Sequence, residues 1–138
     1  MSGSSSSAVP LVGRVLVSVV FLFSGLSKVM AFSMMTGMAA SKHMPLPALM
    51  IAGAAAVELL GGLAILTGFQ AKLASWVLFL YLIPTTILFH NFWTLQGMDR
   101  IDAQAHFLKN VAIMGGLLFL AAFGSGAYSI DSRISSRA

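Results

Sequence analysis

The fold of this chain is decided by the stretch PALMIAGAAAVELLGGLAILTGF, residues 47–69. It contains a single charged residue, Glu58, and a helix of this length crosses the hydrocarbon core of a bilayer, which is roughly 30 Å thick. Similar apolar segments occupy residues 10–31, 72–93 and 106–123. Because lipid offers the backbone no hydrogen bonds, such segments must be helical. The sequence predicts an all-α fold, an integral membrane four-helix bundle with up-down-up-down topology.

Composition supports the same class of protein. Of the 138 residues, 58% are hydrophobic and 9% are charged, whereas a soluble domain carries about 25% charged residues. The net charge of +4 comes from basic residues scattered singly among apolar runs, so no nucleic-acid partner is expected. The absence of cysteine excludes disulfides, thiolate metal sites and cysteine nucleophiles. The lipid bilayer is the expected environment.

The regions outside the four segments are short and polar or rich in methionine. Residues 1–9 contain five serines and predict a disordered tail, and residues 132–138 predict a polar C-terminal tail. The four-helix transmembrane domain is expected to span residues 10–131. Its first connection, residues 32–46, is a Met-rich loop long enough for a short interfacial helix, and residues 94–105 read as a polar loop.

Four spans place both termini on one side of the membrane. The basic residues divide evenly between the two sides, four on each. Setting aside Lys28 and Lys109, which lie within helices, leaves more basic residues on the terminal side. The positive-inside rule then predicts cytoplasmic termini.

The chain contains an internal repeat. Residues 57–69, VELLGGLAILTGF, align without gaps to residues 111–123, VAIMGGLLFLAAF. Because the second and fourth helices run in the same direction, the match predicts a duplicated helix pair. The alternative is that the glycines simply permit close helix crossings. The glycines assigned to these crossings are Gly61, Gly62, Gly115 and Gly116.

Glu58 is the most informative residue. A carboxylate in the middle of a membrane helix costs several kcal/mol and is usually paired or functional. The repeat places Lys109 about one helical turn from the depth of Glu58, which makes it one candidate partner. Lys28, which follows Ser24 at i,i+4 on the same helix face, is the other. Both partners are compatible with the sequence.

Other polar residues gather toward the same side of the membrane. The functional interpretation is a pocket that binds a small molecule or relays protons; the alternative is a purely structural network. Three histidines without i,i+4 spacing predict no metal site. Tyr81 is interpreted as an interfacial anchor or packing residue. The residues of the hypothetical pocket are Lys28, Glu58, His90, Asn91, Lys109 and Asn110.

Four segments in this order resemble the DoxX family of small four-helix membrane proteins: GRVLVSVVFLFSGLSKV, VELLGGLAILTGF, ILFHNFW and HFLKNVAIMGGLLFL. The resemblance covers about residues 13–131. It implies a prokaryotic inner (plasma) membrane protein and points to positions already singled out. Those positions are Arg14, Gly25, Lys28, Glu58, Gly61, Gly62, His90, Lys109 and Asn110.

The resemblance also suggests function, because the family takes its name from a subunit associated with a thiosulfate:quinone oxidoreductase. The leading hypothesis is a non-catalytic membrane subunit that anchors or stabilises a larger redox or energy-conserving complex, with other membrane subunits or further copies of itself as partners. The alternatives are a quinone-linked oxidoreductase component, with a pocket around Glu58, and a small proton-coupled transporter. The chain contains no flavin or nucleotide fingerprint, so no intrinsic cofactor and no independent catalysis are expected, and quinone is the candidate ligand.

Overall fold

The computed structural model of the chain describes residues 5–137, and these form helices joined by short connections. Four of the helices, α1, α3, α4 and α5, are long and apolar enough to cross a membrane. The predicted all-α membrane bundle is therefore confirmed. In chain order the elements are α1 (Ser5–Met30), α2 (Phe32–Ser41), α3 (Pro47–Thr67), α4 (Ala71–Phe89), the 3-10 turn η1 (Phe92–Thr94), α5 (Gly97–Phe123) and α6 (Ile130–Ser135).

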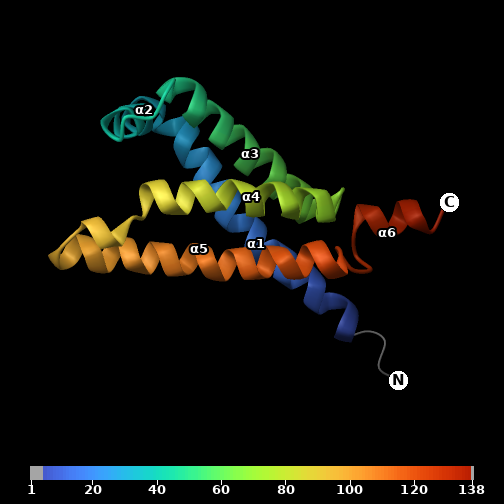
Figure 1. Cartoon of the computed structure of the whole chain (residues 1–138). Helices are drawn as coiled ribbons and strands as arrows, with labels where there is room; N and C mark the ends of the chain where they lie inside the picture. The colour runs from blue at the N-terminus through green and yellow to red at the C-terminus, as the bar shows by residue number, and fades with distance from the viewer. Residues whose placement is uncertain (1–4, 138) are drawn as a thin grey trace.

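The membrane helices associate as two pairs. α1 packs along α3, α4 packs along α5, and the contact between α3 and α4 joins the pairs. Figure 1 shows the start of α1 and the short α6 toward one end of the molecule, with α2 at the other end. α1 and α5 touch only slightly. The two pairs therefore diverge on the side of α2, and this divergence positions the site described below.

The ends of the chain are more helical than the sequence predicts. α1 begins at Ser5, so the second half of the expected disordered tail is helical, while residues 1–4 lie outside the described part of the chain. At the other end, α6 takes up most of the region expected to be a C-terminal tail. The Ser129 side chain caps α6 by accepting a hydrogen bond from the backbone N–H of Ser132. Such a cap satisfies a donor that a short helix would otherwise leave open.

The helix assigned to residues 106–123 also begins earlier, at Gly97. The segment expected to be a polar loop therefore shortens to η1 and its flanking residues. Asp99 lies in the first turn of α5, where a carboxylate interacts favourably with the helix dipole. Ala103 is buried in the same stretch. The charged residues that suggest a loop in the sequence instead start a helix that extends beyond the apolar segment.

Methionine-rich α2 forms the short helix expected in the first connection. The chain then turns through Leu46, which has a left-handed backbone (φ 47°), and enters α3 at Pro47. Proline suits the first turn of a helix because its missing N–H has no partner there. The Pro45–Leu46–Pro47 stretch thus separates α2 from the second membrane span.

Two of the four predicted crossing glycines lie at close helix contacts. A Cβ atom on Gly61 would lie 2.8 Å from Leu78 Cγ on α4, and one on Gly62 would lie 3.0 Å from Leu22 on α1. On α5, Gly116 would make only an ordinary contact of 3.7 Å with Val17, and Gly115 would meet no atom of the described chain within 4 Å. The repeated glycine pair therefore serves different packing on the two helices.

This difference predicts unequal effects of leucine at two repeat-related glycines. Gly61→Leu should lower stability by about 1–3 kcal/mol, because the new side chain must displace Leu78 at the α3–α4 contact. Gly115→Leu, which adds the same side chain to an open position, should leave the melting temperature in detergent unchanged or raise it. Equal melting shifts for the two variants would contradict the α3–α4 packing.

The terminal end of the bundle is closed by contacts that the sequence does not predict. Arg14, one of the positions singled out by the family resemblance, is fully buried and donates a hydrogen bond from Nη2 to the backbone oxygen of Tyr128. Asp131 accepts hydrogen bonds from the backbone N–H groups of Gln70 (2.8 Å) and Ala71 (3.1 Å) at the start of α4. The segment after α5 therefore folds back over the α3–α4 turn.

The topology makes a labelling prediction that also tests the cytoplasmic termini. Because the chain has no cysteine, Ser41→Cys at the end of α2 and Ser136→Cys after α6 each give one thiol at an exposed position. In intact cells, a membrane-impermeant maleimide should label residue 41 from outside and should reach residue 136 only after the membrane is permeabilised. Labelling of both from the same side would contradict a four-span topology.

Candidate functional site

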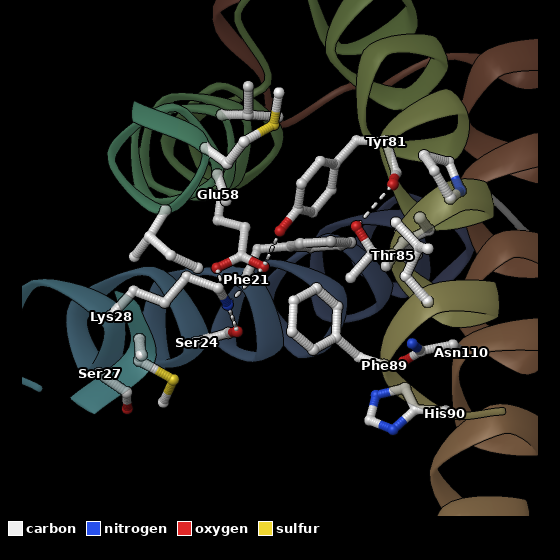
Figure 2. A pocket seen from close by; sticks show the side chains of 18 of the residues that line it. Phe21, Ser24, Ser27, Lys28, Glu58, Tyr81, Thr85, Phe89, His90 and Asn110 are labelled. Carbon is white, nitrogen blue, oxygen red and sulfur yellow. Dashed lines mark hydrogen bonds and ion pairs between the residues drawn. The ribbon is translucent and has the colours of Figure 1, made fainter. Parts of the chain in front are cut away.

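Glu58 is paired with Lys28, so the structure selects one of the two partners that the sequence leaves open. The Lys28 Nζ atom lies 3.0 Å from Glu58 Oε1 and 2.9 Å from Oε2. The exposed fractions of the two side chains are 16% and 4%. α1 supplies the lysine and the middle of α3 supplies the glutamate, and Figure 2 shows the two side chains pointing toward each other. The carboxylate in the membrane is therefore neutralised by a direct ion pair.

Two hydroxyl groups complete this cluster. Tyr81 on α4 donates a hydrogen bond of 2.8 Å to Glu58 Oε1, and Lys28 Nζ donates one of 2.9 Å to Ser24 Oγ (Figure 2). The group of Ser24, Lys28, Glu58 and Tyr81 is called the polar floor below. Tyr81 is the member that the sequence analysis missed, because nothing in the pattern of an apolar helix distinguishes a tyrosine that packs from one that reaches a carboxylate.

Gly25 allows α1 and α3 to approach closely enough for the ion pair. A Cβ atom at this position would lie 2.8 Å from Leu59 Cγ and 3.2 Å from Glu58 Cβ. A larger residue would push the helices apart next to Lys28. Within the sequence SGLSK, residues 24–28, Ser24 supplies a hydroxyl group, Gly25 allows the close helix contact and Lys28 supplies the cation, all within about one turn of helix.

The polar floor lies in a cavity of about 1110 Å³ lined by residues from α1 to α5. Most of its lining is apolar and includes the rings of Phe21 and Phe89. Several lining residues of α1 and α4 are exposed on the outside of the bundle, among them Val19, Phe23 and Leu88. The cavity therefore reaches the outer, lipid-facing surface of these two helices.

At the loop side, the cavity is bordered by four basic side chains, called the basic mouth below. The rings of His90 and His106 are stacked with centroids 5.2 Å apart, and Lys109 Nζ lies 3.1 Å from His106 Nδ1. Lys42, at the end of α2, lies over the ring of Phe89, 5.8 Å from its centroid. All four side chains line the same cavity as the polar floor.

Five of the six predicted pocket residues line this cavity, in three different places. Lys28 and Glu58 form the floor, and His90 and Lys109 belong to the mouth. Asn110 borders the cavity at the α4–α5 contact, where its Nδ2 donates a buried hydrogen bond of 3.0 Å to Thr86 Oγ1. The sixth residue, Asn91, is not among the described lining residues and precedes η1.

Lys109 does not reach Glu58 because of how the helices pair. α5 packs on α4, whereas α3 packs on α1, so a lysine on α5 faces the α4 side of the cavity. The repeat correctly places Lys109 near one end of its helix but carries no information on which neighbour that helix contacts. Within the part of the chain described, no cluster of three histidine or acidic side chains could hold a metal ion.

These features define a class of protein: a small integral membrane helical bundle with a lipid-accessible cavity, an ion pair at its floor and basic residues at its mouth. The DoxX family profile matches residues 9–91 of the chain. The chain is 30% identical over 131 residues to the inner membrane protein YphA of Escherichia coli, covering 95% of this chain and 94% of that protein. The chain therefore belongs to the DoxX family.

Two other relatives differ in how much of their own length is matched. The inner membrane protein YqjF of Escherichia coli is 34% identical over 125 residues, with 88% of each chain covered. The ER-derived vesicles protein ERV29 of Saccharomyces cerevisiae is 31% identical over 77 residues, which is 56% of this chain but 25% of that protein. No solved structure matches the chain significantly.

Proposed function

We propose that this DoxX protein binds a quinone-type ring compound in the cavity and serves as a non-catalytic membrane subunit of a larger redox assembly. The observation that carries the proposal is the polar floor inside an apolar, lipid-accessible cavity. Ser24 Oγ accepts a hydrogen bond from Lys28 and donates none within the described chain. Its hydroxyl proton is therefore free for a ligand oxygen, and the neighbouring ammonium group polarises it.

The size and lining of the cavity fit such a ligand. Its volume of about 1110 Å³ is slightly larger than the roughly 300–1,000 Å³ of common small-molecule sites. Phe21 and Phe89 provide aromatic surfaces against which a ring can pack. The opening past Val19 and Phe23 gives an apolar tail a route into lipid. A quinone would then place a carbonyl oxygen at Ser24 and its tail in the bilayer.

In the alternative role, as a component of a quinone-linked oxidoreductase, the same floor would supply the protons of quinone reduction. Reduction of a quinone to a quinol takes up two electrons and two protons, and Lys28, Glu58 and Tyr81 form a connected set of exchangeable protons. The electrons would come from a partner, since the chain contains no cysteine for an iron–sulfur cluster and no nucleotide fingerprint. The names of YphA and YqjF support an inner-membrane location for that assembly.

Ligand binding is tested with two serines on the same helix. A short-tailed ubiquinone should bind the protein saturably in lipid nanodiscs free of quinone, as measured by calorimetry. Ser24→Ala should weaken binding about fivefold, the size expected for one lost hydrogen bond. Ser27→Ala is the matched control, because Ser27 also lines the cavity but donates its proton to Phe23 O at 2.8 Å.

Two results would count against the proposal. Equal weakening by the two serine variants, or binding that does not saturate above the level of empty nanodiscs, would contradict a site at the polar floor. The subunit role is tested by purification in mild detergent, where a stoichiometric partner protein is expected. Isolation of the chain alone, with full quinone binding, would contradict that role and leave the site in place.

A further inference from the structure

The charge of the cavity lining is unbalanced. Three lysines line the cavity, Lys28, Lys42 and Lys109, against one carboxylate in the described lining, Glu58. Lys28 and Glu58 neutralise each other at the floor. The excess of positive charge therefore lies at the basic mouth, where the cavity leaves the apolar part of the bundle. A neutral quinone held at the floor makes no use of it.

The contacts within the mouth leave most of its donors free. Lys109 has three N–H donors, and the described chain provides one acceptor for them, His106 Nδ1. Accepting this bond leaves the proton of neutral His106 on Nε2, which faces Asp102 at 3.7 Å. Asp102 is 78% exposed and is not among the described lining residues. Its carboxylate therefore offsets part of the positive charge beside His106 but leaves the mouth with two lysines against one carboxylate.

The remaining two residues of the mouth are held without a carboxylate partner. Lys42 lies over the ring of Phe89, a contact that orients the ammonium group but leaves its N–H groups unbonded within the described structure. The His90 ring stacks on the His106 ring, and the His90 side chain makes no hydrogen bond within the described part of the chain. Two lysines and a histidine thus present donors at the border between an apolar cavity and water, where their attraction to an anion exceeds that in bulk water.

We propose that the basic mouth is an anion subsite and that the cavity takes an anionic amphiphile, a molecule with a phosphate or carboxylate group on an apolar chain. The anionic group would lie among Lys42, His90 and Lys109, with the chain along Phe89 and Phe21 in the cavity. This inference rests on the proposed function in one respect, because it requires the cavity to admit a ligand. It adds a second recognition point at the opposite end from the polar floor.

An amphiphile fits the site better than a free anion for a geometric reason. The basic donors border only the loop side of the cavity, and an inorganic anion bound there would make no contact with the apolar lining beyond it. Burial of an alkyl chain raises the affinity about fourfold for each CH₂ group that leaves water. The attached chain should therefore raise the affinity far above that of the same anionic group alone.

The experiment compares three probes on the whole protein in a maltoside detergent by native mass spectrometry: monododecyl phosphate, 1-dodecanol and inorganic phosphate. Monododecyl phosphate should bind at one saturable site and at least tenfold more tightly than either of the others. Lys42→Gln and Lys109→Gln should each weaken it about fivefold, and the double variant about 20-fold, without changing dodecanol binding. Both lysines are exposed, so the variants should fold normally.

Arg100→Gln is the matched control, because Arg100 is exposed at the same side of the membrane but is not among the described lining residues. It should change the affinity less than twofold. Equal weakening by Arg100→Gln would overturn the proposal in favour of general attraction to a positive surface. If dodecanol binds as tightly as monododecyl phosphate, the anionic group contributes nothing and the anion subsite is contradicted. If inorganic phosphate binds as tightly, the alkyl chain contributes nothing and an amphiphilic ligand is contradicted.

The test also separates this inference from the quinone proposal. If ubiquinone binds with the Ser24 dependence described above and monododecyl phosphate does not bind, the anion subsite fails alone. If monododecyl phosphate binds with the lysine dependence and ubiquinone does not bind, the quinone proposal fails and the anion subsite stands. Lack of binding by both probes would overturn both.

Discussion

Replacing Glu58 with glutamine should destabilise the protein by about 3–5 kcal/mol, the cost typical of breaking a buried ion pair. The substitution keeps the shape of the side chain and still offers an oxygen to Tyr81. It removes the negative charge that lies 2.9 Å from Lys28 Nζ, however, and leaves the ammonium group unpaired on a side chain that is only 16% exposed. Reversible unfolding in mixed detergent micelles, followed by circular dichroism, measures the change.

A double-mutant cycle shows whether the loss belongs to the pair. Lys28→Met should destabilise the protein by a similar amount, because it leaves the carboxylate without its cation. The double variant Lys28→Met, Glu58→Gln removes both charges and should recover much of the loss. Lys109→Met serves as the control, since Lys109 contacts His106 rather than Glu58. Coupling of Glu58 to Lys109 as large as its coupling to Lys28 would contradict the observed pairing.

This prediction also distinguishes a structural role of the floor from a ligand-binding one. Ser24→Ala removes the hydroxyl proposed to meet a ligand oxygen while leaving the Lys28–Glu58 pair in place. We expect it to affect quinone binding with little change in stability, whereas Glu58→Gln should affect both. If the polar floor served stability alone, Glu58→Gln would destabilise the protein and Ser24→Ala would leave quinone binding unchanged.

The membrane spans and the need for a partner at Glu58 could be predicted from the sequence, because both depend on the transfer of groups into lipid. Apolar segments of sufficient length must be helical there, and a carboxylate in the middle of one must be neutralised. The rule applies to a residue whatever its neighbours are. It therefore identified Glu58 without information on how the helices pack, and the repeat and the position of Lys28 after Ser24 supplied the two candidate partners.

The choice between Lys28 and Lys109 could not be predicted, because it depends on helix pairing. α3 is apolar on all sides, so hydrophobicity does not mark the face that contacts α1 or α4. The contact of Tyr81 with Glu58 could not be predicted for the same reason, because the sequence does not distinguish Tyr81 from any other aromatic residue of an apolar helix. Gly25 was singled out through the family resemblance, but its close contact with Leu59 beside the ion pair appears only once α1 and α3 are placed together.

The terminal end shows a second limit. Arg14 near the start of an apolar segment is read as a residue that extends to the interface, and Asp131 follows the last apolar segment by several residues. In the structure the chain returns over the α3–α4 turn and buries the guanidinium group against Tyr128. The contacts of an irregular segment depend on the course of its backbone, and the hydrophobic periodicity of the sequence does not predict that course.

This closure makes Gly68 the position where one methyl group should have a large effect. Gly68 ends α3 with a left-handed backbone, φ 69°, which costs other residues about 1–3 kcal/mol in strain. A Cβ atom there would overlap the Arg14 guanidinium and the side chain of Ser129, and it would lie 3.1 Å from Ser129 Cα. Relief requires the segment before α6 to move, which threatens the bond from Asp131 N–H to Gly68 O, 2.9 Å long.

Gly68→Ala should therefore lower the free energy of unfolding by at least about 2 kcal/mol, as strain and overpacking add. Gly97→Ala is the matched control: Gly97 also has a positive φ, 62°, but a Cβ atom there meets no atom of the described chain within 4 Å. Gly97→Ala has the backbone strain without the overlap. The difference between the two melting temperatures therefore measures the cost of disturbing the contacts at the terminal end of the bundle. Equal melting shifts for the two alanine variants would mean that the segment carrying Asp131 does not pack against the α3–α4 turn.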